Sequence, residues 1–493
     1  MFNRITPEAA GIPSSKVADF ISLLERRGLV THSVLMMKGD DIFAEYYWKP
    51  FDADFCHRMY SETKSYVSIA IGLLEEDGLL NLDDKMASYF EDKYDHELNE
   101  FLGELTIREM LCMTTCRSGN YWFSFDDPDR TRLYFRRLES GSHPSGTVWE
   151  YDSSGSQVLS ALVERLSGKS LFDFLYERIF CHLGTFKTAE ILKTKNNDSW
   201  GDSALVCTTR DMASFGRLLM KKGNHEGKQL INADYVTRAT SAVVDNRENC
   251  HGSVFAHGYG YQIWRTEQNS FAFNGMGCQF TICTPDKDLL FVITGDNQGN
   301  ASAANVIVGA YMDLIVSSAS QDPLEENKEA QGKLAAVTAD LKLRALCGMA
   351  DSPMREKIDG KTFICRENHA GITKFCFKFM GDHGEFCYTN AQGDKVIPFG
   401  VNKNVFGKFP QLGYADDHGG IVTQNGFMYN DAVSLCWSQE NKLWMFIQII
   451  DRYFGNCSAS FSFKENMAVC RMAKTAEDFL GEYVGDIVAE MEL

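Results

Sequence analysis

A serine and a lysine lie three residues apart at the start of a long apolar segment, in Ser61-Glu62-Thr63-Lys64. A helix that begins near Ser61 places both side chains on one face, one turn apart. A serine hydroxyl is a weak nucleophile until a neighbouring group takes its proton, which a lysine can do where its amine is neutral. The spacing therefore predicts a nucleophile with its base. On this motif alone, a helix cap beside a solvated lysine is an equal alternative.

The element that carries these two residues is predicted to be a buried helix. From Tyr66 to Leu74 the residues are apolar or small on nearly every face, which is typical of a helix covered on all sides. Polar residues follow, and Gly78 is placed to end the helix. Backbone amides at the start of such a helix favour negative charge that develops beside Ser61.

Two further segments place polar or small residues at the ends of predicted elements. Tyr151-Asp152-Ser153 precedes an apolar-periodic helix that ends at Gly168. The glycine-rich turn at residues 274–279 joins two strand-like segments. Near the first segment, the aromatic residues Tyr121 and Trp149 are candidates for the wall of a pocket, although core packing is at least as good an interpretation.

Taken in this order, Ser61-x-x-Lys64, Tyr151-Asp152-Ser153 and the turn at 274–279 resemble the motifs of the penicillin-recognising serine hydrolases. This group contains class C β-lactamases, D-aminopeptidases, D-alanyl-D-alanine carboxypeptidases, related esterases and 6-aminohexanoate-oligomer hydrolases. The resemblance covers roughly residues 5–315. It implies a β-lactamase-like α+β domain, in which helices flank an antiparallel sheet.

The resemblance also implies roles for individual residues. Ser61 is the acylated nucleophile, Lys64 its base, and Tyr151 the hydroxyl that relays a proton to the leaving group. The backbone amides of Ser61 and Met276 form the oxyanion hole. The substrate-binding candidates are Ser153, Gly275, Gly277, Trp149 and Tyr121. Neither a cofactor nor a metal ion is expected.

Two departures from the family pattern bear on the substrate. Class C β-lactamases carry Tyr-x-Asn where this chain has Tyr151-Asp152-Ser153, so a hydroxyl replaces the amide that holds a β-lactam side chain. Penicillin-binding enzymes carry Lys-Thr-Gly where this chain has Asn274-Gly275-Met276, which offers neither a cation nor a hydroxyl for a carboxylate. We therefore expect a small ester or amide as substrate.

The chain of 493 residues is too long for one ordinary core. Strand-like segments at 258–264, 270–274, 279–284 and 289–294 complete the first domain, predicted over residues 1–320. A charged, proline-bearing segment then predicts a linker at 321–335. Alternating apolar residues after it predict a smaller, mostly β domain at 336–493.

Composition excludes some partners. The net charge of −18, without a Lys/Arg-rich block, argues against nucleic acid and anionic membrane surfaces. The first residues lack the apolar core of a signal peptide, and fifteen cysteines are scattered without Cys-x-x-Cys spacing, so we expect a cytoplasmic protein with reduced thiols. His251 and His257 are more typical of solvated loop residues than of metal ligands. The sequence makes no prediction of oligomeric state.

Two alternatives to the enzyme stay open. A catalytically silent relative would use the same cleft to bind a ligand or partner, although Ser61, Lys64 and Tyr151 are all present. The β-rich C-terminal domain would otherwise be the functional module, as a lid or a partner-binding surface, but its sequence shows no chemistry of its own.

Overall fold

The computed structural model describes residues 2–116, 127–136, 141–411, 428–452, 454–475 and 480–492. The chain forms two compact units, Met1–Lys342 and Leu343–Leu493. The division lies later than the linker expected at 321–335, because that segment contains most of α12 (Lys328–Thr338), which packs against α1 (Ser14–Arg26) in the first unit.

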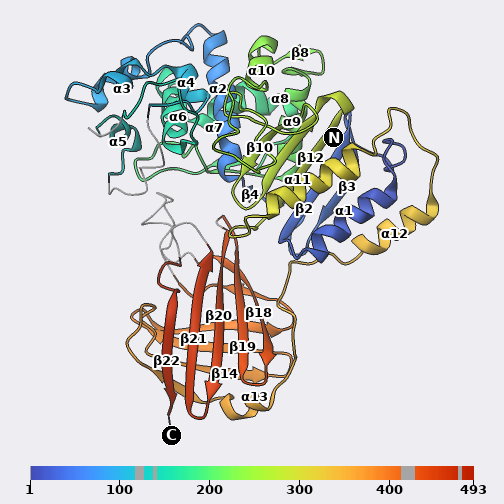
Figure 1. Ribbon diagram of the computed structural model, residues 1–493, viewed down its shortest axis with the longest axis vertical. Coiled ribbons are helices and arrows are strands. Elements are labelled where there is room, and N and C mark those ends of the chain that lie inside the picture. The colour runs from blue at the N-terminus through green and yellow to red at the C-terminus, as the bar shows by residue number, and fades with distance from the viewer. Residues whose placement is uncertain are drawn as a thin grey trace. The chain divides into compact units, whose positions relative to one another are not determined.

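A seven-stranded sheet forms the centre of the first unit (Figure 1). Its strands, in spatial order, are β1 (Asn3–Arg4), β3 (Asp41–Tyr47), β2 (Thr31–Lys38), β12 (Leu289–Gly295), β11 (Gln279–Thr284), β10 (Phe271–Gly275) and β9 (Trp264–Arg265). Neighbouring strands are antiparallel except β1, which runs parallel to β3. The sheet with its helices confirms the predicted α+β class.

Each face of this sheet packs into its own hydrophobic core, because successive side chains of a strand point to opposite faces. In β2, Leu35 and Met37 belong to one core, and Val34 and Met36 to the other. The first core lies under α2 (Thr63–Glu76) and α9 (Thr209–Met220), where the rings of Tyr66 and Phe215 stack at 3.9 Å. The sheet is therefore buried on both faces.

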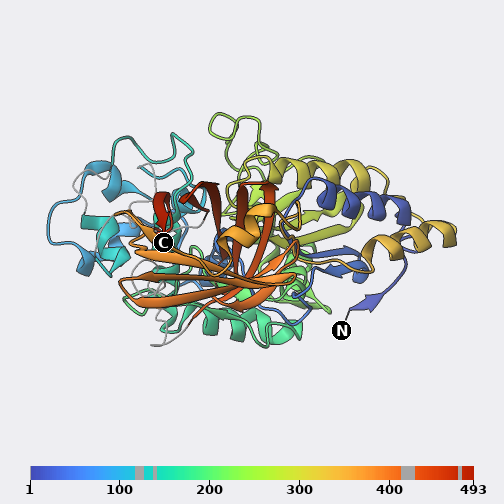
Figure 2. The same cartoon turned by 90° about the horizontal axis from the view of Figure 1, so that it is seen from below.

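The second core lies under α1 and α11 (Ala303–Ala310), which run beside each other over the same face of the sheet (Figure 2). Phe291 of β12 joins them, with its ring 5.5 Å from that of Phe20 and 4.6 Å from that of Tyr311. Other helices of the first unit are α3 (Glu100–Glu104), α4 (Ile107–Leu111), α5 (Arg130–Arg136), α6 (Ser153–Ser167), α7 (Leu171–Leu175), α8 (Cys181–Leu183) and α10 (Ala233–Ala239).

The prediction of a strand at 258–264 is wrong over most of its length, since only Trp264 and Arg265 of this region join the sheet, as β9. Gly260 packs so closely on the chain that an added Cβ would lie 2.0 Å from the carbonyl oxygen of Ala239. Gln262 has a left-handed φ of 56°, which interrupts an extended strand. Its side-chain amide donates instead to the carbonyl oxygen of Met110, at 3.0 Å.

The second unit is a ten-stranded sheet that closes on itself, because β16 pairs with β18 as well as with β15. Its strands are β13 (Thr362–Cys365), β14 (Lys374–Met380), β15 (His383–Asn390), β16 (Gly393–Val401), β17 (Val405–Lys408), β18 (Asn430–Gln439), β19 (Lys442–Ile450), β20 (Phe454–Lys464), β21 (Met467–Thr475) and β22 (Gly485–Met491), with one short helix, α13 (Pro353–Ile358). Aromatic rings fill the interior, and Phe377 lies 5.1 Å from Phe386 and 4.9 Å from Phe461. The alternating apolar residues of this part of the sequence predicted a mostly β second domain.

Within the described ranges, none of the helices combines the length and the apolar character that crossing a membrane requires.

Gly72 lies in the middle of α2, and a substitution there probes how tightly this helix packs. An added Cβ would lie 2.5 Å from the ring of Tyr235, which cannot swing away because it is buried and its hydroxyl donates to the Ser68 carbonyl oxygen at 2.6 Å. We expect Gly72→Ala to lower the free energy of unfolding by about 2 kcal/mol, as overpacking does. Urea unfolding measures the change.

Gly309 in α11 is the matched control, since a Cβ added there would meet no atom within 4 Å. Gly309→Ala should raise the free energy of unfolding by about 0.5 kcal/mol through helix propensity alone. A Gly72→Ala protein as stable as Gly309→Ala would contradict the packing described for α2.

Candidate active site

Ser61 lies in a 3₁₀ turn, η1 (Tyr60–Glu62), that leads directly into α2. Tyr60 has a left-handed φ of 48°, a conformation that costs energy for a residue with a side chain. Surrounding contacts hold this turn: Thr63 Oγ1 donates to the Tyr60 carbonyl oxygen at 2.6 Å, and the Arg58 guanidinium lies 4.5 Å from the Tyr60 ring centre. Ser61 is thereby presented, half-exposed, at the start of a buried helix.

Lys64 is fully buried and its amine lies against the serine. Its Nζ donates to Ser61 Oγ at 2.9 Å and to the Asp202 carbonyl oxygen at 2.6 Å. The same nitrogen is 3.9 Å from Asp202 Oδ2 and 5.2 Å from the centre of the Tyr151 ring. The structure thus brings together Ser61, Lys64 and Tyr151, which the sequence places in two distant segments.

Asp202 is a site residue that the sequence did not indicate. Burial raises the pKa of its carboxyl group, although the positive charges of Lys64, Arg130 and Arg58 oppose the rise. The guanidinium groups of Arg58 and Arg130 each lie 4.6 Å from the centre of the Trp200 ring. No local pattern marks Asp202, because its partner Lys64 is 138 residues away in the chain.

Tyr151 precedes α6, whose first turn is fixed by Asp152. The Asp152 side chain accepts from the Gly155 amide at 3.0 Å and from Thr115 Oγ1 at 3.1 Å, so it acts as a helix cap. Ser153 is the first residue of the helix and is buried. The Tyr151 ring stacks on Trp264 of β9, with centres 5.7 Å apart and planes at 20°. Tyr151 therefore lies between the lysine amine and the edge of the sheet.

Trp149 belongs to a small hydrophobic cluster with Met113 and Tyr259. Its ring makes edge contacts with Tyr259 at 5.5 Å and with Trp264 at 5.6 Å. Trp149 is therefore packed in the core, which was one of the two interpretations considered for it. Its ring packs against Trp264, which in turn stacks on Tyr151. Tyr121, the other aromatic candidate, lies outside the described residues.

The glycine-rich turn lies between β10 and β11, and β10 packs against the turn that carries Ser61. A Cβ on Gly275 would be 2.1 Å from the Met59 carbonyl oxygen, so only glycine allows this approach. Gly277 has φ 80°, and Gln279 Nε2 donates to the carbonyl oxygens of Met276 at 2.8 Å and Gly295 at 2.7 Å. The turn with Met276 is therefore held firmly beside η1.

A buried carboxyl group lies directly after the nucleophile. Glu62 is completely buried and faces Thr281 of β11. Burial raises the pKa of Glu62 to about 8, although hydrogen-bonding groups of Thr281 oppose the rise. At neutral pH this side chain is therefore an uncharged acid behind Ser61.

A histidine pair supports the chain just before the nucleophile. His32 Nδ1 and His57 Nε2 lie 2.8 Å apart, and His57 Nδ1 lies 2.9 Å from the Arg58 carbonyl oxygen. Burial lowers the pKa of His57 to about 3 and also lowers the pKa of His32, so both rings are neutral at pH 7. Over the ranges that the structure covers, no group of three or more His, Cys, Asp or Glu side chains could hold a metal ion.

Comparison with known proteins agrees with this fold. Residues 18–307 match the description of the Beta-lactamase family. Because this match covers more than half of the chain, the protein belongs to the Beta-lactamase family.

Individual relatives are distant. The chain is 22% identical over 264 residues to a 6-aminohexanoate-dimer hydrolase of Paenarthrobacter ureafaciens, covering 50% of this chain and 67% of that protein. It is 24% identical over 204 residues to a D-aminopeptidase of Brucella ovis, covering 36% of this chain and only 37% of that protein. A penicillin-binding protein homologue from Caulobacter crescentus superposes with a TM-score of 0.51 at 15% identity, over 62% of this chain and 98% of its own. That structure shows a shared fold.

Glu62 makes the stability of the protein depend on pH. Its folded-state pKa of about 8 exceeds the ordinary value of 4.5, so between these pH values unfolding releases a proton and the free energy of unfolding falls as pH rises. Glu62→Gln removes this titration. We expect it to raise the free energy of unfolding at pH 7.5 by up to about 4 kcal/mol, since pH 7.5 lies three units above 4.5 and each unit is worth about 1.4 kcal/mol.

Chemical denaturation between pH 4 and 9 checks this prediction. The gain from Glu62→Gln should shrink towards zero as pH falls to about 4.5. Glu76→Gln, which changes an exposed carboxyl group at the other end of α2, is the matched control and should leave the pH dependence as it is. The same pH dependence in wild type and Glu62→Gln would show that Glu62 is ionised at neutral pH.

Proposed function

We propose that this protein is a serine hydrolase that cleaves a small ester or amide through an acyl-enzyme at Ser61. The observation that carries the proposal is the 2.9 Å contact between Lys64 Nζ and Ser61 Oγ, with the lysine fully buried. Family membership and relatives named as a dimer hydrolase and an aminopeptidase support hydrolysis as the class of reaction.

In the proposed mechanism, Lys64 takes the proton of Ser61 as Oγ attacks the substrate carbonyl carbon. The negative charge that develops on the carbonyl oxygen is stabilised by the backbone amides of Ser61 and Met276. The proton passes through the Tyr151 hydroxyl to the departing alcohol or amine, which leaves Ser61 acylated. Water then attacks the acyl-enzyme and releases a carboxylic acid.

The proposed preference for an ester or amide follows from the glycine-rich turn at residues 274–279. Asn274-Gly275-Met276 supplies no cation or hydroxyl to bind a substrate carboxylate, which weakens recognition of penicillins. Ser153, Gly275 and Gly277 are retained as proposed substrate-binding positions. We also propose a cytoplasmic location, which is supported by the fifteen cysteines, all within the described ranges and all free thiols.

The first test is covalent labelling of the full chain with a fluorophosphonate, followed by intact mass. Wild type should gain one adduct, Ser61→Ala none, and Lys64→Met should react at least about 100-fold more slowly because the base is lost. Penicillin under the same conditions should give little or no adduct. A folded wild type that takes up no fluorophosphonate would favour the catalytically silent, ligand-binding alternative.

Gly275→Ala tests the oxyanion side of the site. The new Cβ would collide with the Met59 carbonyl oxygen, so the turn with Met276 must move away from Ser61. We expect the fluorophosphonate rate to fall by about 100-fold, the loss typical of a removed oxyanion-hole donor. Gly103→Ala in α3, whose Cβ meets no atom within 4 Å, is the matched control and should label at the wild-type rate. Wild-type labelling of Gly275→Ala would remove Met276 from the proposed site.

A further inference from the structure

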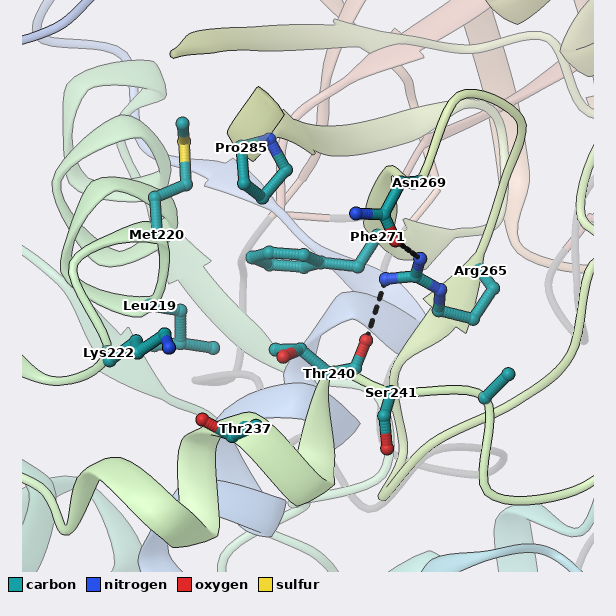
Figure 3. A pocket seen from close by; sticks show the side chains of 11 residues that line it. Leu219, Met220, Lys222, Thr237, Thr240, Ser241, Arg265, Asn269, Phe271 and Pro285 are labelled. Carbon is teal, nitrogen blue, oxygen red and sulfur yellow. Dashed lines mark hydrogen bonds between the residues drawn. The ribbon is translucent and has the colours of Figure 1, made fainter. Parts of the chain in front are cut away.

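A pocket lies in the first unit beside the start of β10 (Figure 3). Its volume is about 400 Å³. Phe271, the first residue of β10, lines it, whereas Gly275, the last, contacts the turn that carries Ser61. Four residues of extended strand separate the two by about 13 Å. The pocket is therefore distinct from the candidate active site.

Arg265 gives this pocket its charge. Its guanidinium donates to the Thr240 carbonyl oxygen at 2.8 Å and to Asn269 Oδ1 at 2.6 Å, and both acceptors are uncharged (Figure 3). Across the described part of the chain, no carboxylate comes within ion-pair distance of Arg265. The nearby Asp286 instead accepts from Asn269 Nδ2 at 3.2 Å.

The electrostatics of Arg265 differ from those of other arginines in this unit. Burial lowers its pKa, and the charge of Asp286 only partly opposes the effect. Bonds to carboxylates raise the pKa of Arg108 and Arg210 instead. A partly desolvated guanidinium that makes no ion pair with a described carboxylate favours the approach of an anion. Lys222, which also lines the pocket, adds a second positive charge.

The rest of the lining is largely apolar. Phe271 and Leu219, which are almost fully buried, line the pocket together with Met220 and Pro285 (Figure 3). A ligand with one charged end and a short hydrocarbon body matches this combination of a cation at one side and apolar surface at the other. A strongly hydrated inorganic anion would leave the apolar surface unused.

We propose that this pocket binds a small amphipathic monocarboxylate, with its carboxylate on Arg265 and its hydrocarbon body over Phe271, while Lys222 adds positive charge at the edge of the pocket. Arg265 also links the pocket to the candidate active site, because its neighbour in β9 is Trp264, whose ring stacks on Tyr151. Successive residues of a strand face opposite sides, so one side of β9 serves the pocket and the other supports Tyr151.

A carboxylic acid is also the product of the proposed hydrolysis, so the pocket suits a regulatory site for that class of product. This link to turnover rests on the proposed function, whereas binding itself does not. Binding is therefore measured without any reaction, which keeps a failure of this proposal separate from a failure of the hydrolase assignment.

The experiment titrates the full chain with sodium hexanoate and follows binding by ligand-observed NMR. Wild type and Ser61→Ala should bind hexanoate with the same Kd within twofold. Arg265→Gln should weaken binding at least tenfold, and the uncharged analogue 1-hexanol should bind wild type at least tenfold more weakly than hexanoate does. Thermal unfolding confirms that each variant is folded.

Lys222→Glu is a second variant that keeps the test decisive if Arg265→Gln does not fold. Lys222 is exposed, so reversal of its charge should leave the fold intact and weaken hexanoate binding at least tenfold. Hexanoate binding that is unchanged in both variants, absent from wild type, or lost in Ser61→Ala would overturn the proposal. The last result would place the bound hexanoate at the candidate active site instead.

Discussion

The buried amine of Lys64 is the constraint on which the candidate site depends. An amine without hydrogen-bond partners is costly in an apolar interior, so the fold must supply polar atoms to it. It does so with Ser61 Oγ and the main-chain oxygen of Asp202, and it places the Tyr151 ring beside the same nitrogen. These contacts require three segments that are far apart in the chain to come together around Lys64. Helix α2 can lie at their centre because it is apolar on nearly every face.

Close backbone packing fixes the other side of Ser61. Gly275 lies against the Met59 carbonyl oxygen, and Gln279 ties the following turn to Met276 and Gly295. These contacts involve main-chain atoms and one buried amide, so they position the turn independently of the side chain at 276. The left-handed Tyr60 and the glycine approach at 275 both belong to this junction, which is where strain is expected to be tolerated.

The sequence was most informative where chemistry and periodicity are local. The buried helix after Ser61, its end near Gly78, the strands on both sides of the turn at 274–279 and the β-rich second unit were all predicted from short-range patterns. The contact between Ser61 and Lys64 follows from helical spacing. By contrast, the place of Tyr151 came only through family resemblance, because spacing carries no information across about 90 residues of chain.

Residues whose role depends on distant burial were not predictable. Asp202 and the His32–His57 pair have no local signature, since each contact joins segments far apart in the sequence. Glu62 was visible inside the motif, yet only the position of β11 shows that its carboxyl group is buried against Thr281. The strand expected at 258–264 failed for a similar reason, because the packing of Gly260 on Ala239 overrides local strand propensity.

Where penicillin-binding enzymes carry Lys-Thr-Gly, this chain has Asn274-Gly275-Met276, a difference that affects substrate recognition and not the reacting groups. In Asn274-Gly275-Met276, Gly275 lets β10 approach the Met59 carbonyl oxygen beside η1, while the side chains that would bind a carboxylate are absent. A cation that no carboxylate of the described residues pairs with lies instead at Arg265, by the opposite end of the same strand. Under the two proposals made above, strand β10 separates two functions: its end at Gly275 serves acyl transfer without charge recognition, and its beginning at Phe271 offers charge recognition without a nucleophile.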